Sequence, residues 1–196
     1  MSKDASPATR QRLLDAGLAL FLERGYHGVG IQLVLDTADA PKGSFYHHFR
    51  DKEDFALQVL DAYMAGVHQA LDASLADRTV PPIARVRGFF GMVMGSYANE
   101  GYLGCLIGGL GQELSGVSPL FAERIDACLM YISHHLAEPL SEAIVAGDLP
   151  ADTDAEILAR RLVDCWEGAA LRSRLIRDPA PLRDMLDFFF TALAQR

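Results

Sequence analysis

The chain has 196 residues, of which half are hydrophobic, and a formal net charge of −8. This length fits one compact unit, or a small head and a larger body. No apolar run approaches the roughly 18 residues that cross a bilayer, and the polar N-terminus lacks a signal-peptide apolar segment, so we expect no membrane association. The negative charge argues against a protein that attracts polyanions over its whole surface.

Charge and cysteine placement refine this picture. Residues 1–54 hold seven Lys and Arg against eight Asp and Glu, whereas residues 55–196 hold eleven against eighteen. A near-neutral head could therefore bind DNA only through a few well-placed cations, with the acidic body facing away. Cys105, Cys128 and Cys165 are odd in number and widely spaced, which favours thiols in a reducing cytoplasm over a disulfide framework. We therefore expect a cytoplasmic protein.

The sequence predicts an all-α fold, because Ala, Leu, Arg, Glu and Gln dominate and the alternation typical of strands is absent. Helices are expected over residues 6–24, 31–38, 41–49, 51–75, 83–99, 105–114, 119–146, 154–177 and 181–195. Capping residues support several of these ends: Ser6 and Gly25 for the first helix, Asp51 with Asp54 for the fourth, and Thr153 with Glu156 for the eighth. Pro139 is expected to bend the seventh helix.

The three short helices near the N-terminus predict a helix-turn-helix DNA-binding domain over residues 1–52, followed by an effector-binding and dimerisation domain over residues 53–196. Phe45 and Phe49, four residues apart, are expected to anchor the reader helix against the first helix. The predicted DNA contacts share polar or backbone donors near the N-terminal ends of these helices: Gly30, Gln32, Lys42, Ser44, Tyr46, His47 and Lys52. The pair His47-His48 is not expected to bind metal, because adjacent helical residues point about 100° apart.

Residues 9–55 resemble the TetR family of transcriptional regulators. The resemblance rests on the run Ala-Gly-Leu-Ala-Leu-Phe-Leu-Glu-Arg-Gly-Tyr, then Lys-Gly-Ser-Phe-Tyr-His-His-Phe, then Asp-Lys-Glu-Asp-Phe. It implies a homodimer that binds a palindromic operator on double-stranded DNA and is released by a small effector held in the body. By position, Gly43 and His48 join the DNA-facing set. The turn Asp39-Ala40 departs from the family's usual Gly-Val, so we expect a left-handed Asp39 with slight strain.

The body carries three consecutive aromatic residues, Phe188, Phe189 and Phe190, which cover about 200° of a helix. One core-facing stripe cannot bury all three, so a second surface must cover the rest. Leu162 and Trp166 on the preceding helix complete a predicted four-helix dimer interface, which the resemblance also implies. The alternative is a helix fully buried within a monomer.

A glycine-rich segment, residues 101–116, is the second functional candidate. Its glycines make the helix over 105–114 easy to shift, and in the family this helix transmits movement to the fourth helix. Cys105 at the helix N-terminus would have a lowered thiol pKa. Its surroundings resemble a TetR subgroup that senses electrophiles or oxidants through cysteine. The alternative is a buried small hydrophobic residue. Weaker effector candidates, each equally explained by packing or an interface, are Tyr97, Gln112, Glu113, His134, Trp166 and Arg172.

The sequence therefore predicts a DNA-binding transcriptional regulator, a repressor released by a small or electrophilic effector. A constitutive or activating regulator without an effector is one alternative, and a helical enzyme or ligand carrier is a more remote one. The chain has no Ser-His-Asp pattern, phosphate loop or zinc spacing, so we expect no enzymatic activity, cofactor or metal.

Overall fold

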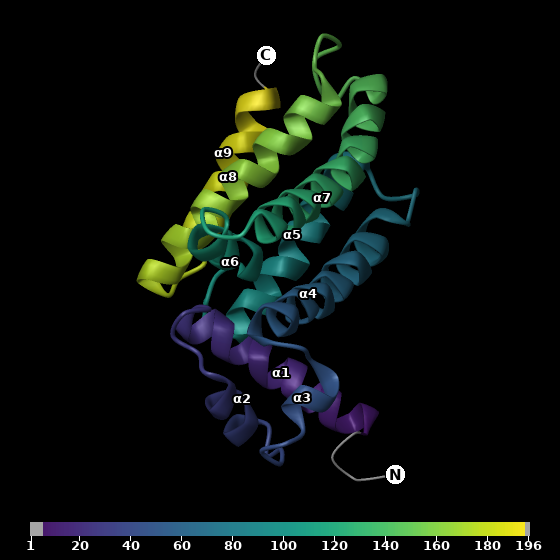
Figure 1. Ribbon diagram of the computed structural model, residues 1–196. Helices are drawn as coiled ribbons and strands as arrows, with labels where there is room; N and C mark the ends of the chain where they lie inside the picture. The colour runs from purple at the N-terminus through teal and green to yellow at the C-terminus, as the bar shows by residue number, and fades with distance from the viewer. Residues whose placement is uncertain (1–5, 195–196) are drawn as a thin grey trace. The chain divides into compact units, whose positions relative to one another are not determined.

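The computed structural model of the protein describes residues 6–194, with side chains to Thr191, and every regular element within this range is a helix (Figure 1). None of these helices is long and apolar enough to cross a membrane. The helices are α1 (Pro7–Arg24), α2 (Ile31–Thr37), α3 (Phe45–His48), α4 (Lys52–Leu75), α5 (Pro82–Asn99), α6 (Leu106–Leu114), α7 (Pro119–Ala146), α8 (Ala155–Ile176) and α9 (Ala180–Ala194).

Internal contacts divide the chain into two units. The first runs to Gly66 and adds residues 106–125, so it contains α1, α2, α3, the first part of α4, α6 and the start of α7. The second contains residues 67–105 and the chain from Asp126 onward, with the rest of α4 and α7 and all of α5, α8 and α9. Compactness thus groups α6 with the helix-turn-helix, whereas the functional division at residue 52 stays a prediction.

The core of the first unit is a cluster of phenylalanines. Phe45 and Phe49 are almost fully buried, and both pack on Phe55 from α4, with ring centroids 5.2 and 4.8 Å from its centroid. Gly17 of α1 allows this packing, because a Cβ atom there would lie 2.4 Å from Phe55 Cζ. The predicted burial of Phe45 and Phe49 is confirmed, but their aromatic partner is Phe55 of α4, whereas the first helix was the expected partner.

The helix starts follow local hydrogen bonds. Ser6 caps α1 as predicted, since its hydroxyl accepts the N–H of Thr9 at 3.2 Å. Asp51 Oδ1 likewise accepts the N–H of Asp54 at 2.8 Å at the start of α4. The cap of α8 is a correction: Asp154, not Thr153, accepts the N–H of Ile157, at 2.9 Å. A carboxylate one residue closer to the helix takes the position that the threonine was expected to fill.

The reader helix is shorter than predicted. Only Phe45–His48 is helical, and Pro41–Ser44 forms a turn in which Ser44 N–H and Oγ donate to Pro41 O at 2.9 and 2.7 Å. A serine side chain that bonds local backbone competes with the helical pattern, and Gly43 lowers helix stability, so the first turn does not form. Asp39, in the preceding turn, has φ of 46°, the left-handed conformation that was predicted.

The second unit is built around α5, α7 and α8, and α8 and α9 lie side by side (Figure 1). Its interior includes Phe90 of α5 and Trp166 of α8, with ring centroids 4.6 Å apart. The buried Arg85 donates to Leu75 O and Val80 O at 3.1 and 3.2 Å and pairs with Glu142. This arginine closes the α4–α5 turn onto α7 without leaving a buried charge unpaired.

Candidate functional site

The helix α2, the turn that follows it and α3 form the reader unit, whose turn and α3 present a small polar surface. Lys42, Gly43, Tyr46 and His47 are exposed, and Tyr46 retains 65% of its accessible surface despite its size. An exposed tyrosine beside a lysine and a histidine offers donors suited to phosphate oxygens or base edges. The surface is carried by the Phe45–Phe49 anchor, so its position relative to the rest of the first unit is fixed by packing.

Ser44 and His48 do not belong to that exposed surface. Ser44 is completely buried, and its hydroxyl is used by Pro41 O, so its predicted phosphate contact is wrong. The physical reason is the turn described above, which rotates Ser44 inward. His48 is half-buried, and its Nε2 atom has no hydrogen-bond partner within the part of the chain that the structure describes.

The start of α2 is exposed, and its contact with the DNA backbone stays a prediction. Gly30 is the N-cap residue, with no side chain to bond the first turn, and Gln32 is exposed. The side-chain amide of Gln32 donates to Asp36 Oδ1 at 2.6 Å, so α2 holds this glutamine on its own surface.

The loop between α1 and α2 is held by two charged side chains. Lys52 Nζ donates to Tyr26 O at 2.7 Å and lies 4.0 Å from the centroid of the Tyr26 ring. Burial lowers the pKa of Lys52, and the nearby Glu113 partly offsets this effect. Glu113, predicted from sequence as an effector residue, accepts the backbone N–H groups of Tyr26 and His27 at 3.0 and 2.9 Å. Its neighbour Gln112 is exposed.

Cys105 lies in the second unit and is half-buried, directly before the first residue of α6. Its thiol is hydrogen-bonded to Glu167 of α8, and burial raises the pKa of that carboxyl above its usual value. The repulsion from Asp164 adds to the rise, whereas the hydrogen bond opposes it. Glu167 was not predicted from the sequence, because a glutamate on an amphipathic helix ordinarily indicates a solvated face. The thiol and a desolvated carboxylate together form a site where a proton can move.

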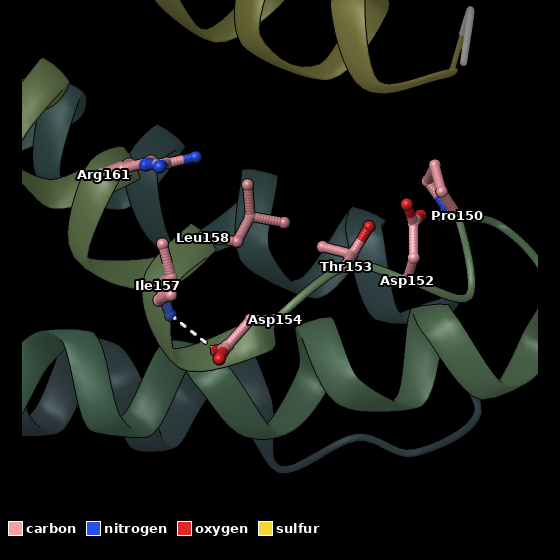
Figure 2. A pocket seen from close by; sticks show the side chains of 7 residues that line it. All are labelled: Pro150, Asp152, Thr153, Asp154, Ile157, Leu158 and Arg161. Carbon is pink, nitrogen blue, oxygen red and sulfur yellow. Dashed lines mark hydrogen bonds between the residues drawn. The ribbon is translucent and has the colours of Figure 1, made fainter.

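The remaining effector candidates do not form one site. Tyr97 and Trp166 are buried in the second unit with ring centroids 6.1 Å apart, within its aromatic core. His134 is exposed, and its Nδ1 atom lies 3.5 Å from Glu156 Oε1. Arg172 is exposed on α8. A cavity of about 390 Å³ lies instead where α8 begins, lined by Pro150, Asp152, Thr153, Asp154, Ile157, Leu158 and Arg161 (Figure 2). None of the predicted effector residues lines it.

The predicted dimer residues divide by exposure. Leu162, Trp166 and Phe190 are buried within the chain itself, so they belong to its core. Phe188 is 75% exposed and Phe189 is half-buried. One face of α9 therefore buries Phe190, and Phe188 points away from it, as the argument from three consecutive aromatics requires.

Two family descriptions match this chain. Residues 13–59 match the bacterial regulatory proteins of the tetR family, and residues 82–189 match the tetracyclin repressor-like C-terminal domain. The two matched segments contain the reader unit and the Cys105 site, respectively.

Curated relatives match nearly the whole chain. The transcriptional regulator AcuR of Cereibacter sphaeroides is 39% identical, over 95% of this chain and 85% of its own. The transcriptional repressor DhaR of Mycobacterium sp. strain GP1 is 34% identical, over 96% of this chain and 94% of its own. The transcriptional repressor NemR of Escherichia coli K12 is 30% identical, over 95% and 94%.

Two solved structures are similar in sequence and fold. A regulatory protein TetR from Rhodobacter sphaeroides has a TM-score of 0.88 at 38% identity, covering 92% of this chain and 96% of its own. The reduced form of E. coli NemR has a TM-score of 0.81 at 30% identity, covering 92% and 94%.

Proposed function

The chain belongs to the TetR family and is a DNA-binding transcriptional repressor, and we propose that an electrophilic or oxidising small molecule sensed at Cys105 releases it from its operator. The observation that carries this proposal is the contact between the Cys105 thiol and the Glu167 carboxyl. A thiol that reacts needs a group to take its proton, and a carboxyl with a raised pKa is a better proton acceptor than an ordinary one.

The DNA-binding side of the proposal is a homodimer on a palindromic operator in the cytoplasm. Each head places Lys42, Tyr46 and His47 against one half-site, and the exposed start of α2 contacts the phosphate backbone. Because these residues supply few cations, the spacing of the two heads contributes much of the discrimination between operators. An effector that changes this spacing would lower affinity without touching the DNA.

The proposed chemistry at Cys105 is addition to an activated double bond. The sulfur bonds to the β-carbon of an unsaturated carbonyl compound while the thiol proton passes to Glu167. The π electrons move to the α-carbon, which then takes that proton, so the carboxylate is regenerated. One of the similar solved structures is a reduced form of E. coli NemR, so oxidation of Cys105 is the second chemistry to test.

The test uses full-length protein and a DNA duplex that the wild type selects from a random-sequence pool. N-ethylmaleimide, and separately hypochlorite, should abolish binding by the wild type and leave Cys105→Ser bound. Cys165→Ser is the matched control, because Cys165 is exposed and its loss should leave the response intact. Equal loss of binding in Cys105→Ser and the wild type would show that the thiol is not the sensor. Binding that no electrophile changes would favour a constitutive or activating regulator.

A further inference from the structure

The α1–α2 loop, residues 25–30, connects the first helix to the helix-turn-helix and is held by a side chain of α6. We propose that Glu113 is a positioning residue for DNA binding: by holding the backbone of this loop, it fixes α6 directly to the reader unit, without passing through α4. The proposal rests on the DNA-binding function stated above. Glu113, which lies outside the predicted DNA-binding domain, would thus help to position that domain for DNA.

The contact is bidentate and specific in geometry. The two carboxylate oxygens of Glu113 each accept one backbone N–H, from Tyr26 at 3.0 Å and from His27 at 2.9 Å. Hydrogen bonds to an ionised acceptor are roughly twice as strong as neutral ones. These two N–H groups lie just past Gly25, whose positive φ turns the chain out of α1, and they bond the carboxylate instead of carbonyls of that helix. The carboxylate therefore replaces the partners that an extended helix would have supplied.

The loop is shaped to receive the carboxylate. Gly25 has φ of 72°, and a Cβ atom at this position would lie 2.1 Å from Glu113 Oε1. The positive φ therefore favours glycine, and a Cβ atom here would displace the Glu113 carboxylate from its bonded position. The residue that ends α1 thus also makes room for α6.

The opposite edge of the same loop is held by a cation. Lys52 donates to Tyr26 O and lies over the Tyr26 ring, while Glu113 binds the N–H of the same residue. Tyr26 is thus bracketed by an anion from α6 and a cation from α4. A shift of α6 that withdraws Glu113 would leave the loop attached on one side only.

Two further contacts join the segment that follows α6 to α4 within the same unit. Ser118 Oγ donates to Glu53 Oε1 at 2.7 Å, and Arg124 pairs with Asp61. Only Glu113 reaches the loop before α2, among these three attachments. The other two keep the segment in place when Glu113 is removed, so a substitution there should act locally.

The experiment compares Glu113→Ala and Glu113→Gln with Gln112→Ala, a substitution at the exposed neighbouring residue. On the duplex selected by the wild type, Glu113→Ala should bind roughly tenfold more weakly, because it removes two charge-assisted hydrogen bonds. Glu113→Gln should lie between, since its amide oxygen can still accept one N–H. Gln112→Ala should bind like the wild type. The salt dependence should be unchanged in all three, because no cation is removed.

Amide hydrogen exchange followed by NMR distinguishes a local loss of these two hydrogen bonds from a general loss of stability. The N–H groups of Tyr26 and His27 should exchange faster in Glu113→Ala while the buried amides of α4 keep their protection. Wild-type affinity in both Glu113 variants, or faster exchange throughout the unit, would overturn the inference. If Glu113→Ala fails to fold, Glu113→Gln decides by the same two measurements. A wild type that selects no duplex would instead overturn the DNA-binding function itself.

Discussion

Glu167 carries a carboxyl group that loses its proton less readily in the folded protein than in the unfolded chain. Burial raises its pKa, so in the folded protein the protonated form is favoured relative to the unfolded chain. Its contribution to stability is therefore complete below the unfolded pKa of about 4.3 and is lost as the pH rises through the higher folded pKa. The side chain of Glu167→Gln stays neutral at every pH. The melting temperature of this variant minus that of the wild type should therefore increase as the pH rises from roughly 4.5 to roughly 8.

Thermal unfolding monitored by circular dichroism checks this prediction. Glu123→Gln is the matched control, because Glu123 is an exposed glutamate on α7, and its difference from the wild type should stay flat over the same range. A difference for Glu167→Gln that does not depend on pH would contradict a desolvated carboxyl.

Lys42 is an exposed cation on the reader turn, and its neighbourhood is nearly neutral. If it neutralises a phosphate, Lys42→Ala should weaken binding to all sequences equally and reduce the slope of log affinity against log salt by roughly 0.9 for each phosphate that the variant no longer neutralises. Arg183→Ala removes a cation from α9 and should leave the slope unchanged. Fluorescence anisotropy at several salt concentrations measures both, and relaxed specificity at one base pair would instead assign Lys42 to base reading.

Single residues were predictable where their role depends on near neighbours in sequence. Phe45 and Phe49 share a face because they are four residues apart, and Asp39 adopts the left-handed turn conformation that short polar side chains tolerate. Ser44 was not predictable, because its hydroxyl had two plausible partners, DNA and its own backbone. Glu113 binds two amides that lie 87 and 86 residues away in sequence, and no spacing rule reports such a contact.

At the scale of elements, helices were predicted well where a cap and a breaker agree. Ser6, Gly25 and Asp51 place the ends of α1 and α4 within a residue of their observed positions. The reader helix was the exception, since Pro41 favours a helix start only if the following residues continue it, and Gly43 and Ser44 do not. What the pattern could not give is the assignment of α6 to the first unit, because that depends on long-range packing.

The stability of α6 gives a matched pair of substitutions. A Cβ atom at Gly109 would meet nothing within 4 Å, whereas one at Gly111 would lie 3.2 Å from Ile125 Cγ2. Gly109→Ala should therefore raise the free energy of unfolding by about 0.5–1 kcal/mol, the helix-propensity gain. Gly111→Ala should gain less, because Ile125 must move. Urea unfolding compares the two, and equal gains would show that Ile125 does not constrain α6.

The same pair bears on the response to an effector. If release requires α6 to shift, the stiffer helix of Gly109→Ala should need more N-ethylmaleimide to lose the selected duplex than the wild type does. An unchanged dose would mean that α6 moves as a rigid rod, with its internal stability irrelevant to release.

At the scale of the whole molecule, the chain leaves a hydrophobic surface on α8 and α9. Phe188 is 75% exposed, and Leu175 and Ile176 on α8 are 68% and 52% exposed. Contiguous exposed apolar patches mark interfaces, whereas single exposed apolar residues are normal, and we propose that these residues belong to an interface. A second copy of the chain is the occupant that the family implies, and it would place two reader units on one operator.

Phe188→Glu tests that arrangement, because it puts a charge where an aromatic ring would be buried between two copies. Loss of a central aromatic contact typically costs at least 2 kcal/mol, so dimer dissociation should become at least roughly 30-fold easier. The variant should elute as a monomer by light scattering at low micromolar concentration and bind a palindromic duplex no better than a single half-site. Val145→Glu is the control, since Val145 is 87% exposed on α7 and its charge should leave the dimer intact. If the Phe188→Glu protein stays dimeric, the interface lies on another face. The distance between the two reader units would then not depend on contacts made by α9.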